Sequence, residues 1–404
     1  MASTLKEISQ AAGTSVSTAS LILNGRQAHR FTAATQEAVL QAADRLGYRP
    51  QRAAQSLVTG KTRNVALIVN SLANPFFSRY ASLIQAGLMQ HDYTAIPIEI
   101  RSEQMQEKGV WIDWIDQRAV DAVIDLQGAM RVGQAMGEVY ERFSRHRPIV
   151  FRQLADSPEL APHAGVIVDY TVGFRAMAQH LAEIGCVDTG VVTVKGHAPR
   201  GHATRSSNST PTRATGRNAG LAESSGGSVG GGGGRGGGGD DFFVMIRQAL
   251  TDAGLRCEDA YFRGVDDERA DSPDWCESTV DLLRKQPQIK ALVVHNLDAV
   301  PAVLHGVRLA GRSLGADLAL ASFDDMPLAR WLGPGITVVD EPAVQVAASI
   351  VDLVLSEIAG KRMAGHKRTL STQLIVRGST DPHWEGRDHC RVDSAPSAAP
   401  RHAS

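Results

Sequence analysis

The sequence predicts a small all-α headpiece followed by an α/β core of two lobes, each built on a doubly wound parallel sheet. Apolar side chains recur at helical spacing in the first 46 residues. From Asn64 onward, short β-branched runs such as Val65–Val69 alternate with helix-length segments as far as Ile358. This alternation is typical of βαβ units, and the strands are too many for one ordinary sheet. We therefore expect two similar lobes that face each other across a cleft.

The residues from Leu5 to Asn24 read LKEISQAAGTSVSTASLILN and predict two short helices. Gly13 ends the first helix, and Ser15 is placed to cap the second. A helix, a glycine-containing turn and a second helix form the helix-turn-helix motif, whose second helix enters the major groove of DNA. An ordinary helical hairpin would show the same pattern, so these residues alone leave both interpretations open.

A third helix from Thr35 to Leu46 is expected to close a three-helix core. Pro50 begins a short helical piece, Gln51 to Val58, which needs DNA or a second subunit to stay ordered because isolated helices of this length are marginal in water. The predicted organisation is a DNA-binding headpiece at 1–48, a hinge helix and linker at 49–63, a core at 64–380 with a disordered insert at 196–241, and a disordered tail at 381–404.

The composition is that of a soluble globular protein, with 43% apolar and 21% charged residues. Residues 1–63 carry eight lysines and arginines against three acidic residues, although the net charge of the whole chain is −1. A basic head on an acidic body is expected if only the head touches phosphate. The sequence shows no signal peptide and no apolar run long enough to span a membrane, so we expect a cytoplasmic protein without a membrane partner.

The segment from Gly196 to Asp240 contains GGSVGGGGGRGGGG and cannot form a core. Its glycines match nucleotide-binding spacings only trivially, because no strand runs directly into it. The sequence also lacks a nucleophile elbow, an HExxH motif and a phosphate-binding loop, and its four cysteines lack metal-ligand spacing. We expect no catalysis, no cofactor and no metal. The alternative is a small-molecule-binding protein of the transport type. The basic headpiece argues against this alternative.

Beyond these patterns, the chain resembles the bacterial lactose-repressor/galactose-repressor (LacI/GalR) family of transcription regulators. The resemblance runs from Thr4 to about Thr380, apart from the Gly-rich insert. Its most specific parts are TLKEISQAAGTSVSTASLILNG, LGYRPQRAAQSLVTGKT, the NPFF of Asn74 to Phe77, SFDDMPLARWLGPGITVVDEP and LIVRGST. The resemblance implies a two-lobed core like that of periplasmic sugar-binding proteins. It also implies a homodimer on near-palindromic operator double-stranded DNA, located in the bacterial cytoplasm with the nucleoid.

On this resemblance, the phosphate contacts are short polar side chains near helix N-termini: Thr4, Ser15, Thr18, Ser20, Asn24, Thr32 and Thr35. Base readout falls on Val16, Ser17 and Leu21. Many family members have arginine where Leu21 stands, so we expect this chain to prefer a different operator half-site. Leu57 matches the hinge leucine that wedges into the minor groove, and a surface or dimer-contact leucine is its alternative.

The resemblance also places a small-molecule effector, a carbohydrate or a related metabolite, in the cleft between the lobes. The residues to which it points are Phe76 and Phe77 for stacking, with Asn296 and Asp324 as polar anchors. Core phenylalanines and a helix-capping Asp324 are the alternatives. The chain departs from the family in having Asn296–Leu297 for an asparagine–aspartate pair, and Phe242 nearest to the sugar-gripping arginine. We expect a repressor under effector control, and a regulator without effector response is the alternative.

Overall fold

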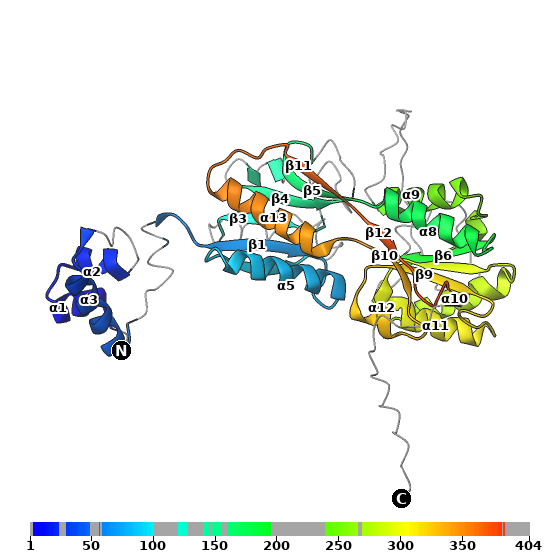
Figure 1. Ribbon diagram of the computed structural model, residues 1–404, viewed down its shortest axis with the longest axis horizontal. Helices are drawn as coiled ribbons and strands as arrows, with labels where there is room; N and C mark the ends of the chain where they lie inside the picture. Colours follow the sequence, from blue (N-terminus) through cyan, green and yellow to red (C-terminus); the bar gives the residue numbers. More distant parts are fainter. Residues whose placement is uncertain are drawn as a thin grey trace, which may run out of the picture.

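A computed structural model describes residues 3–23, 30–48, 56, 59–100, 120–127, 140–141, 143–144, 147–154, 160–194, 239–265, 269–381 and 383. Three helices near the N-terminus form the headpiece, and two six-stranded sheets with their helices form the core (Figure 1). The predicted fold class is thereby confirmed. In the described ranges, every helix is too short or too polar to cross a membrane.

The headpiece consists of α1 (Leu5–Ala11), α2 (Val16–Leu23) and α3 (Ala33–Arg45). Gly13 has a φ of +62°, a left-handed conformation that glycine adopts without steric cost, so it can end α1 and turn the chain into α2. The buried side chains come from all three helices and are Ile8, Ala19, Ile22, Val39, Ala42 and Ala43. Because this core uses one face of each helix, the opposite face of α2 remains available for contact.

The first lobe contains a fully parallel sheet with the order β11-β5-β4-β3-β1-β2. Its strands are β1 (Asn64–Val69), β2 (Thr94–Glu99), β3 (Ala122–Asp125), β4 (Ile149–Gln153), β5 (Ala164–Asp169) and β11 (Lys367–Ser371). Helices α5 (Pro75–Met89) and α13 (Ala343–Ile358) pack against each other on one face. Central strands such as β1 are buried on both faces, which explains their uninterrupted apolar sequence.

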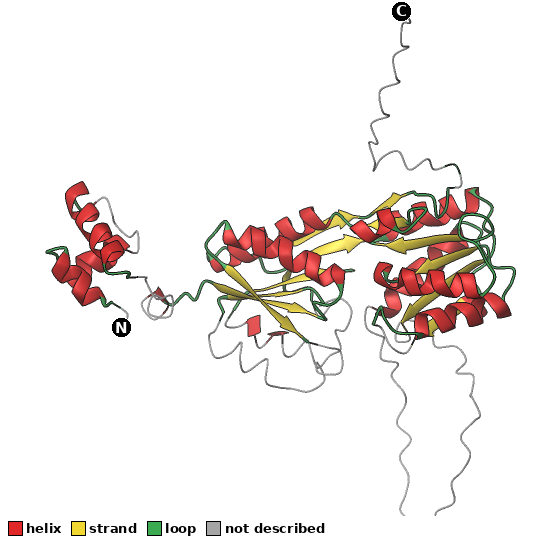
Figure 2. Cartoon of the chain, turned by 90° about the horizontal axis from the view of Figure 1, so that it is seen from below, coloured by secondary structure: helices red, strands yellow, loops and turns green. Residues whose placement is uncertain are grey.

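The second lobe contains a sheet with the order β12-β10-β9-β8-β6-β7, in which β12 alone is antiparallel to its neighbour. Its strands are β6 (Thr189–Val194), β7 (Phe262–Val265), β8 (Ala291–Val294), β9 (Ala319–Phe323), β10 (Thr337–Asp340) and β12 (Gln373–Ile375). One face is covered by α8 (Thr171–Glu183) and α9 (Gly239–Asp252), and the other by α10 (Asp274–Lys285), α11 (Val300–Leu309) and α12 (Pro327–Trp331) (Figures 1 and 2).

The chain passes between the two lobes three times. The connecting residues are Tyr170 between β5 and α8, Glu341 and Pro342 between β10 and α13, and Thr372 between β11 and β12. Thr372 donates through its backbone N–H to the carbonyl oxygen of Asp169 at 3.0 Å, so two of the connections lie side by side. Three polar residues in these connections, Tyr170, Glu341 and Thr372, are also buried. The connections are therefore part of the polar interior between the lobes.

The predicted boundaries need one correction. Helix α9 begins at Gly239, so residues 239–241, expected to be disordered, are helical. The buried side chains of Phe242, Phe243 and Ile246 anchor the first turns of α9. Such packing stabilises the helix, so it begins earlier than the glycine-rich sequence before it predicts. Residues 195–238 of the insert, residues 49–55 of the hinge and residues 384–404 of the tail lie outside the described residues.

Candidate functional site

The first candidate site is the amino end of α2 in the headpiece. The side chain of Val16 is 46% exposed, Ser17 is exposed, and Leu21, which lies one turn further along the helix, is half-buried. Ala19 and Ile22 face the headpiece core instead. The three residues predicted to read bases are therefore on the side of α2 that the headpiece does not use for its own packing.

Hydroxyl side chains cap the helices that surround this face. Ser15 Oγ accepts a hydrogen bond from the backbone N–H of Thr18 at 3.0 Å, and the two hydroxyls are 2.9 Å apart. Thr32 and Thr35 repeat this arrangement at the start of α3, with their hydroxyls 2.8 Å apart. Each pair stands at a helix N-terminus, where unpaired backbone N–H groups attract anions.

The start of α1 is closed differently. Thr4 and Glu7 form a capping box, in which the backbone N–H of Thr4 donates to Glu7 Oε2 at 2.8 Å and Thr4 Oγ1 accepts from the N–H of Glu7. Thr4 is exposed, and Ser20 lies half-buried on α2. Two further predicted DNA contacts, Asn24 and Leu57, lie outside the described residues.

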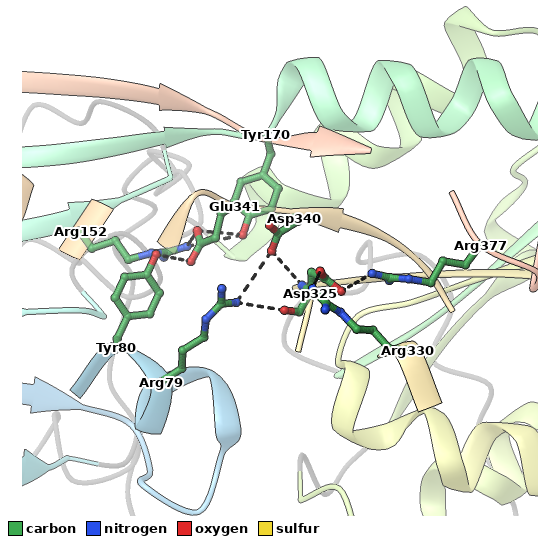
Figure 3. Close-up of polar contacts among 9 residues, drawn as sticks. All are labelled: Arg79, Tyr80, Arg152, Tyr170, Asp325, Arg330, Asp340, Glu341 and Arg377. Carbon is green, nitrogen blue, oxygen red and sulfur yellow. Dashed lines mark hydrogen bonds and ion pairs between the residues drawn. The ribbon is translucent and has the colours of Figure 1, made fainter. Parts of the chain in front are cut away.

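The second candidate site is a buried polar cluster between the lobes, centred on Glu341 (Figure 3). Glu341 Oε1 accepts a hydrogen bond from the hydroxyl of Tyr80 on α5 at 2.5 Å. Glu341 Oε2 accepts from the guanidinium of Arg152 on β4 and from the hydroxyl of Tyr170 at 3.2 Å. The side chains of Arg152 and Glu341 are 3% and 1% exposed, so this ion pair is shielded from solvent.

Burial and charge shift the proton affinities in this cluster. Burial alone would lower the pKa of Arg152, but the neighbouring charge of Glu341 more than offsets this and holds the pKa well above its usual value. The pKa values of Tyr80 and Tyr170 are also raised, first by burial and then by the charge of Glu341. Arg152 therefore stays cationic, and both tyrosines stay neutral hydrogen-bond donors.

A second group of ion pairs lies next to the first, because Asp340 and Glu341 are consecutive in the chain. Asp340 accepts from the backbone N–H of Asp325 at 2.8 Å, and Arg79 of α5 lies 3.9 Å from the Asp340 carboxylate. Asp325 in turn pairs with Arg377 at 2.5 Å and Arg330 at 3.0 Å. Arg79 also donates to the carbonyl oxygen of Asp325 at 3.4 Å, which connects the first lobe directly to the second.

The four predicted effector residues occupy different environments. Phe76 is half-buried, with its ring 4.9 Å from the guanidinium carbon of Arg152, which fits a cation–π contact. Phe77 is 5% exposed and packs in the core of the first lobe, the alternative that its sequence left open. Asn296 is half-buried and precedes a 3₁₀ turn (Leu297–Ala299), which its side chain does not cap.

Asp324 has the most unusual surroundings of the four. It follows β9 with a left-handed φ of +68°, and its Oδ1 atom is buried without a hydrogen-bond partner among the described residues. Burial, and then the charge of Glu341, raise its pKa well above the usual value of a carboxyl group. A buried acceptor without a partner calls for an explanation, and an absent ligand is one.

Phe242 belongs to an aromatic cluster on the second lobe. Its ring lies 5.0 Å from that of Phe174, 5.2 Å from Tyr170 and 5.3 Å from both Phe323 and His295. The position nearest to the family's sugar-gripping arginine is thus apolar and packed. In the described part of the chain, no group of three or more His, Cys, Asp or Glu side chains is placed to hold a metal ion.

Sequence reasoning did not single out Arg152, Glu341, Tyr80 or Tyr170. The available signal was Arg152 itself, a charged residue inside the buried strand sequence IVFRQ. A buried arginine requires a partner, but only the tertiary structure identifies Glu341, which is 189 residues away, as that partner.

Comparison with known proteins gives two domain matches. Residues 4–51 match the model of bacterial regulatory proteins of the lacI family, and residues 229–380 match a periplasmic binding protein-like domain. The ribose operon repressor of Halalkalibacterium halodurans is 22% identical over 93% of this chain and 97% of its own length.

Two solved structures share the fold. The Lac repressor dimer bound to operator and the anti-inducer ONPF matches with a TM-score of 0.72 at 18% identity, covering 94% of this chain and 99% of its own. A complex of the transcriptional regulator CelR with cellobiose matches with a TM-score of 0.60 at 22% identity, covering 93% and 99%. The headpiece and two-lobed core thus define a DNA-binding transcription regulator. The headpiece is similar to the LacI family of bacterial regulatory proteins, and nearly the whole chain is similar to the ribose operon repressor.

Proposed function

We propose that the chain is a homodimeric repressor that binds operator double-stranded DNA and changes its affinity when a small molecule binds between the lobes. The observation that carries this proposal is the exposed amino end of α2, flanked by capped helix N-termini. Such a surface presents apolar and hydroxyl groups to base edges and backbone N–H groups to phosphate. Two copies related by a twofold axis would read the two halves of a near-palindromic operator.

The DNA contacts follow from this orientation. Val16, Ser17 and Leu21 read base edges, and Leu57 of the hinge wedges into the minor groove at the operator centre. The phosphate contacts are Thr4, Ser15, Thr18, Ser20, Asn24, Thr32 and Thr35. We propose the domain limits 1–48 for the headpiece, 49–63 for the hinge and 64–380 for the core, and a site of action at the bacterial nucleoid.

The proposed effector is a carbohydrate or a related metabolite, held by Phe76, Asn296 and Asp324, with Phe77 supporting Phe76 from the core. The buried Asp324 Oδ1 without a partner supports a ligand at this place. Ligand binding would shift the lobes relative to each other through the three connections, and the hinge helices would gain or lose order on DNA.

The test is fluorescence polarisation with the full-length protein and two labelled duplexes, one selected from a random library and one of random sequence. We expect tighter binding to the selected duplex, and affinities for both that fall steeply as salt rises. The measurement is repeated with metabolites added, and release of the selected duplex identifies the effector. An affinity that is insensitive to both sequence and salt contradicts a DNA-binding role.

A second candidate is a regulator that has lost its effector response. The packing of Phe242 against Phe174, Tyr170 and Phe323 favours it, because these rings occupy the second-lobe side of the site. On this alternative the selected duplex stays bound whichever metabolite is added. The same polarisation assay therefore distinguishes the two candidates.

A further inference from the structure

The charge of the buried polar cluster between the lobes carries an inference about which effectors the proposed site accepts. It concerns the four arginines of the polar cluster in Figure 3, each of which lies beside a carboxylate. Arg152 contacts Glu341, Arg79 lies 3.9 Å from Asp340, and Arg330 and Arg377 both pair with Asp325. Among the described residues of this cluster, every arginine thus has a carboxylate partner.

Arg152 contacts one of the proposed effector residues. Its guanidinium lies against the ring of Phe76, and its charge also acts on Asp324 from the opposite lobe. A buried guanidinium at this position could bind a phosphate or carboxylate group of a ligand, since arginine matches both groups in geometry and charge. Glu341 pairs with Nη2 of that guanidinium instead, while Nε has no hydrogen-bond partner among the described residues, and two tyrosine hydroxyls hold the glutamate in place.

We propose that Glu341 is a specificity-determining residue, which keeps Arg152 from binding anions and makes the cleft select uncharged effectors. This inference rests on the proposed effector role of the cleft. An anionic ligand would have to displace Glu341 from Arg152, or lie beside the carboxylates of Glu341 and Asp340 without an arginine to pair with. Like charges brought together in a shielded site are strongly unfavourable.

The decisive variant is Glu341→Gln, because the amide keeps the shape and one oxygen acceptor for a tyrosine hydroxyl but lacks the charge. Arg152 then becomes available to an external anion. Asp324 is the remaining carboxyl group that interacts electrostatically with Arg152. The double variant Glu341→Gln/Asp324→Asn should therefore bind anions more tightly still. Adding Arg152→Leu to Glu341→Gln removes the cation and should abolish the gain.

The probe is inorganic phosphate, added to full-length protein at constant ionic strength, with the unfolding midpoint as the readout. Phosphate that binds the headpiece affects all variants alike, so the quantity of interest is the shift beyond that of the wild type. We expect Glu341→Gln to bind phosphate at least about tenfold more tightly than the wild type. Asp281→Asn is the matched control, because Asp281 of α10 pairs with Arg263 of β7 and with Lys285, outside the cluster, and the substitution removes the same charge.

The inference is wrong if Glu341→Gln responds to phosphate no more than the wild type, or if Asp281→Asn responds equally. If Glu341→Gln does not fold, the phosphate responses of the wild type and of Arg152→Leu still test the inference. Equal phosphate responses in these two proteins support the inference, and a wild-type response that Arg152→Leu abolishes overturns it. Operator binding is measured separately, so a failure of the proposed DNA-binding function is seen in that measurement and not in the phosphate response.

Discussion

The Glu341 carboxylate, which lies in the connection from β10 to α13, binds the Arg152 guanidinium at the end of β4 in the first lobe. The two residues are 189 positions apart in sequence, and both are almost completely buried. The pair fastens one interlobe connection to β4 of the first lobe, and the proposed effector residue Phe76 lies on α5 of the same lobe. A change at this pair is therefore expected to affect both the stability of the core and the geometry of the cleft.

Replacing Glu341 with Ala leaves the Arg152 charge buried without a partner. We expect this to destabilise the core by about 3–5 kcal/mol, because breaking a buried ion pair costs the desolvation of the remaining charge. The double variant Arg152→Met/Glu341→Met should recover most of the loss, since neither charge is then buried. Thermal unfolding followed by circular dichroism measures both variants. A double variant less stable than Glu341→Ala would contradict this account.

Replacing Leu21 with Arg should change the operator sequence that the protein prefers. Arginine can donate two hydrogen bonds to guanine, and such a contact contributes about 1–3 kcal/mol of discrimination. Selection of duplexes from a random library, carried out in parallel for both proteins, reports the change. If both proteins select the same half-site, Leu21 does not face the bases.

Replacing Ser15 with Ala should weaken binding to selected and random duplexes by a similar factor. Ser15 caps α2 and is expected to contact the DNA phosphates rather than the bases, and loss of such a cap costs about 1 kcal/mol of helix stability. Ser17→Ala is the matched control, because Ser17 is exposed on the reading face and should alter discrimination more than overall affinity. Polarisation titrations with both duplexes separate the two effects, and the reverse pattern would exchange the roles of the two serines.

Replacing Leu57 with Ala should reduce affinity for the selected duplex far more than affinity for a random one. A minor-groove wedge acts only where hinge helices assemble on a kinked site, so its loss spares nonspecific binding. Gel shifts with the two duplexes make the comparison. Equal losses would indicate that Leu57 is a surface or dimer contact.

Replacing Asp324 with Asn should stabilise the protein near neutral pH. Burial, followed by the charge of Glu341, raises the pKa of Asp324 in the folded state. The stability linked to this carboxyl group is present below its unfolded pKa of about 4, and is lost as pH rises through the folded pKa. Asparagine lacks this dependence, so the variant should melt higher at neutral pH by on the order of 3 °C. The difference should close toward about pH 4; a constant difference at all pH values would contradict it.

Much of the fold follows from local patterns. The apolar run Val65–Val69 lies in strand β1, and helix α13 ends at Ile358, where the predicted alternation of strands and helices also ends. Strands β11 and β12 were not predicted, because they are short and only partly buried at sheet edges, and their sequences lack an apolar signature. The sequence around α13 also does not indicate that this helix packs on the first lobe after β10 in the second.

The sequence by itself determined the headpiece, the class of the core and the family resemblance, since caps, turns and apolar periodicity depend on neighbouring residues. It placed Ser15 as the cap of α2, and Val16, Ser17 and Leu21 on the face of α2 that points away from the headpiece core. Only the tertiary structure decided how the cleft is charged. The partnership of Arg152 with Glu341 depends on three chain crossings between the lobes, and burial makes that partnership obligatory for both charges.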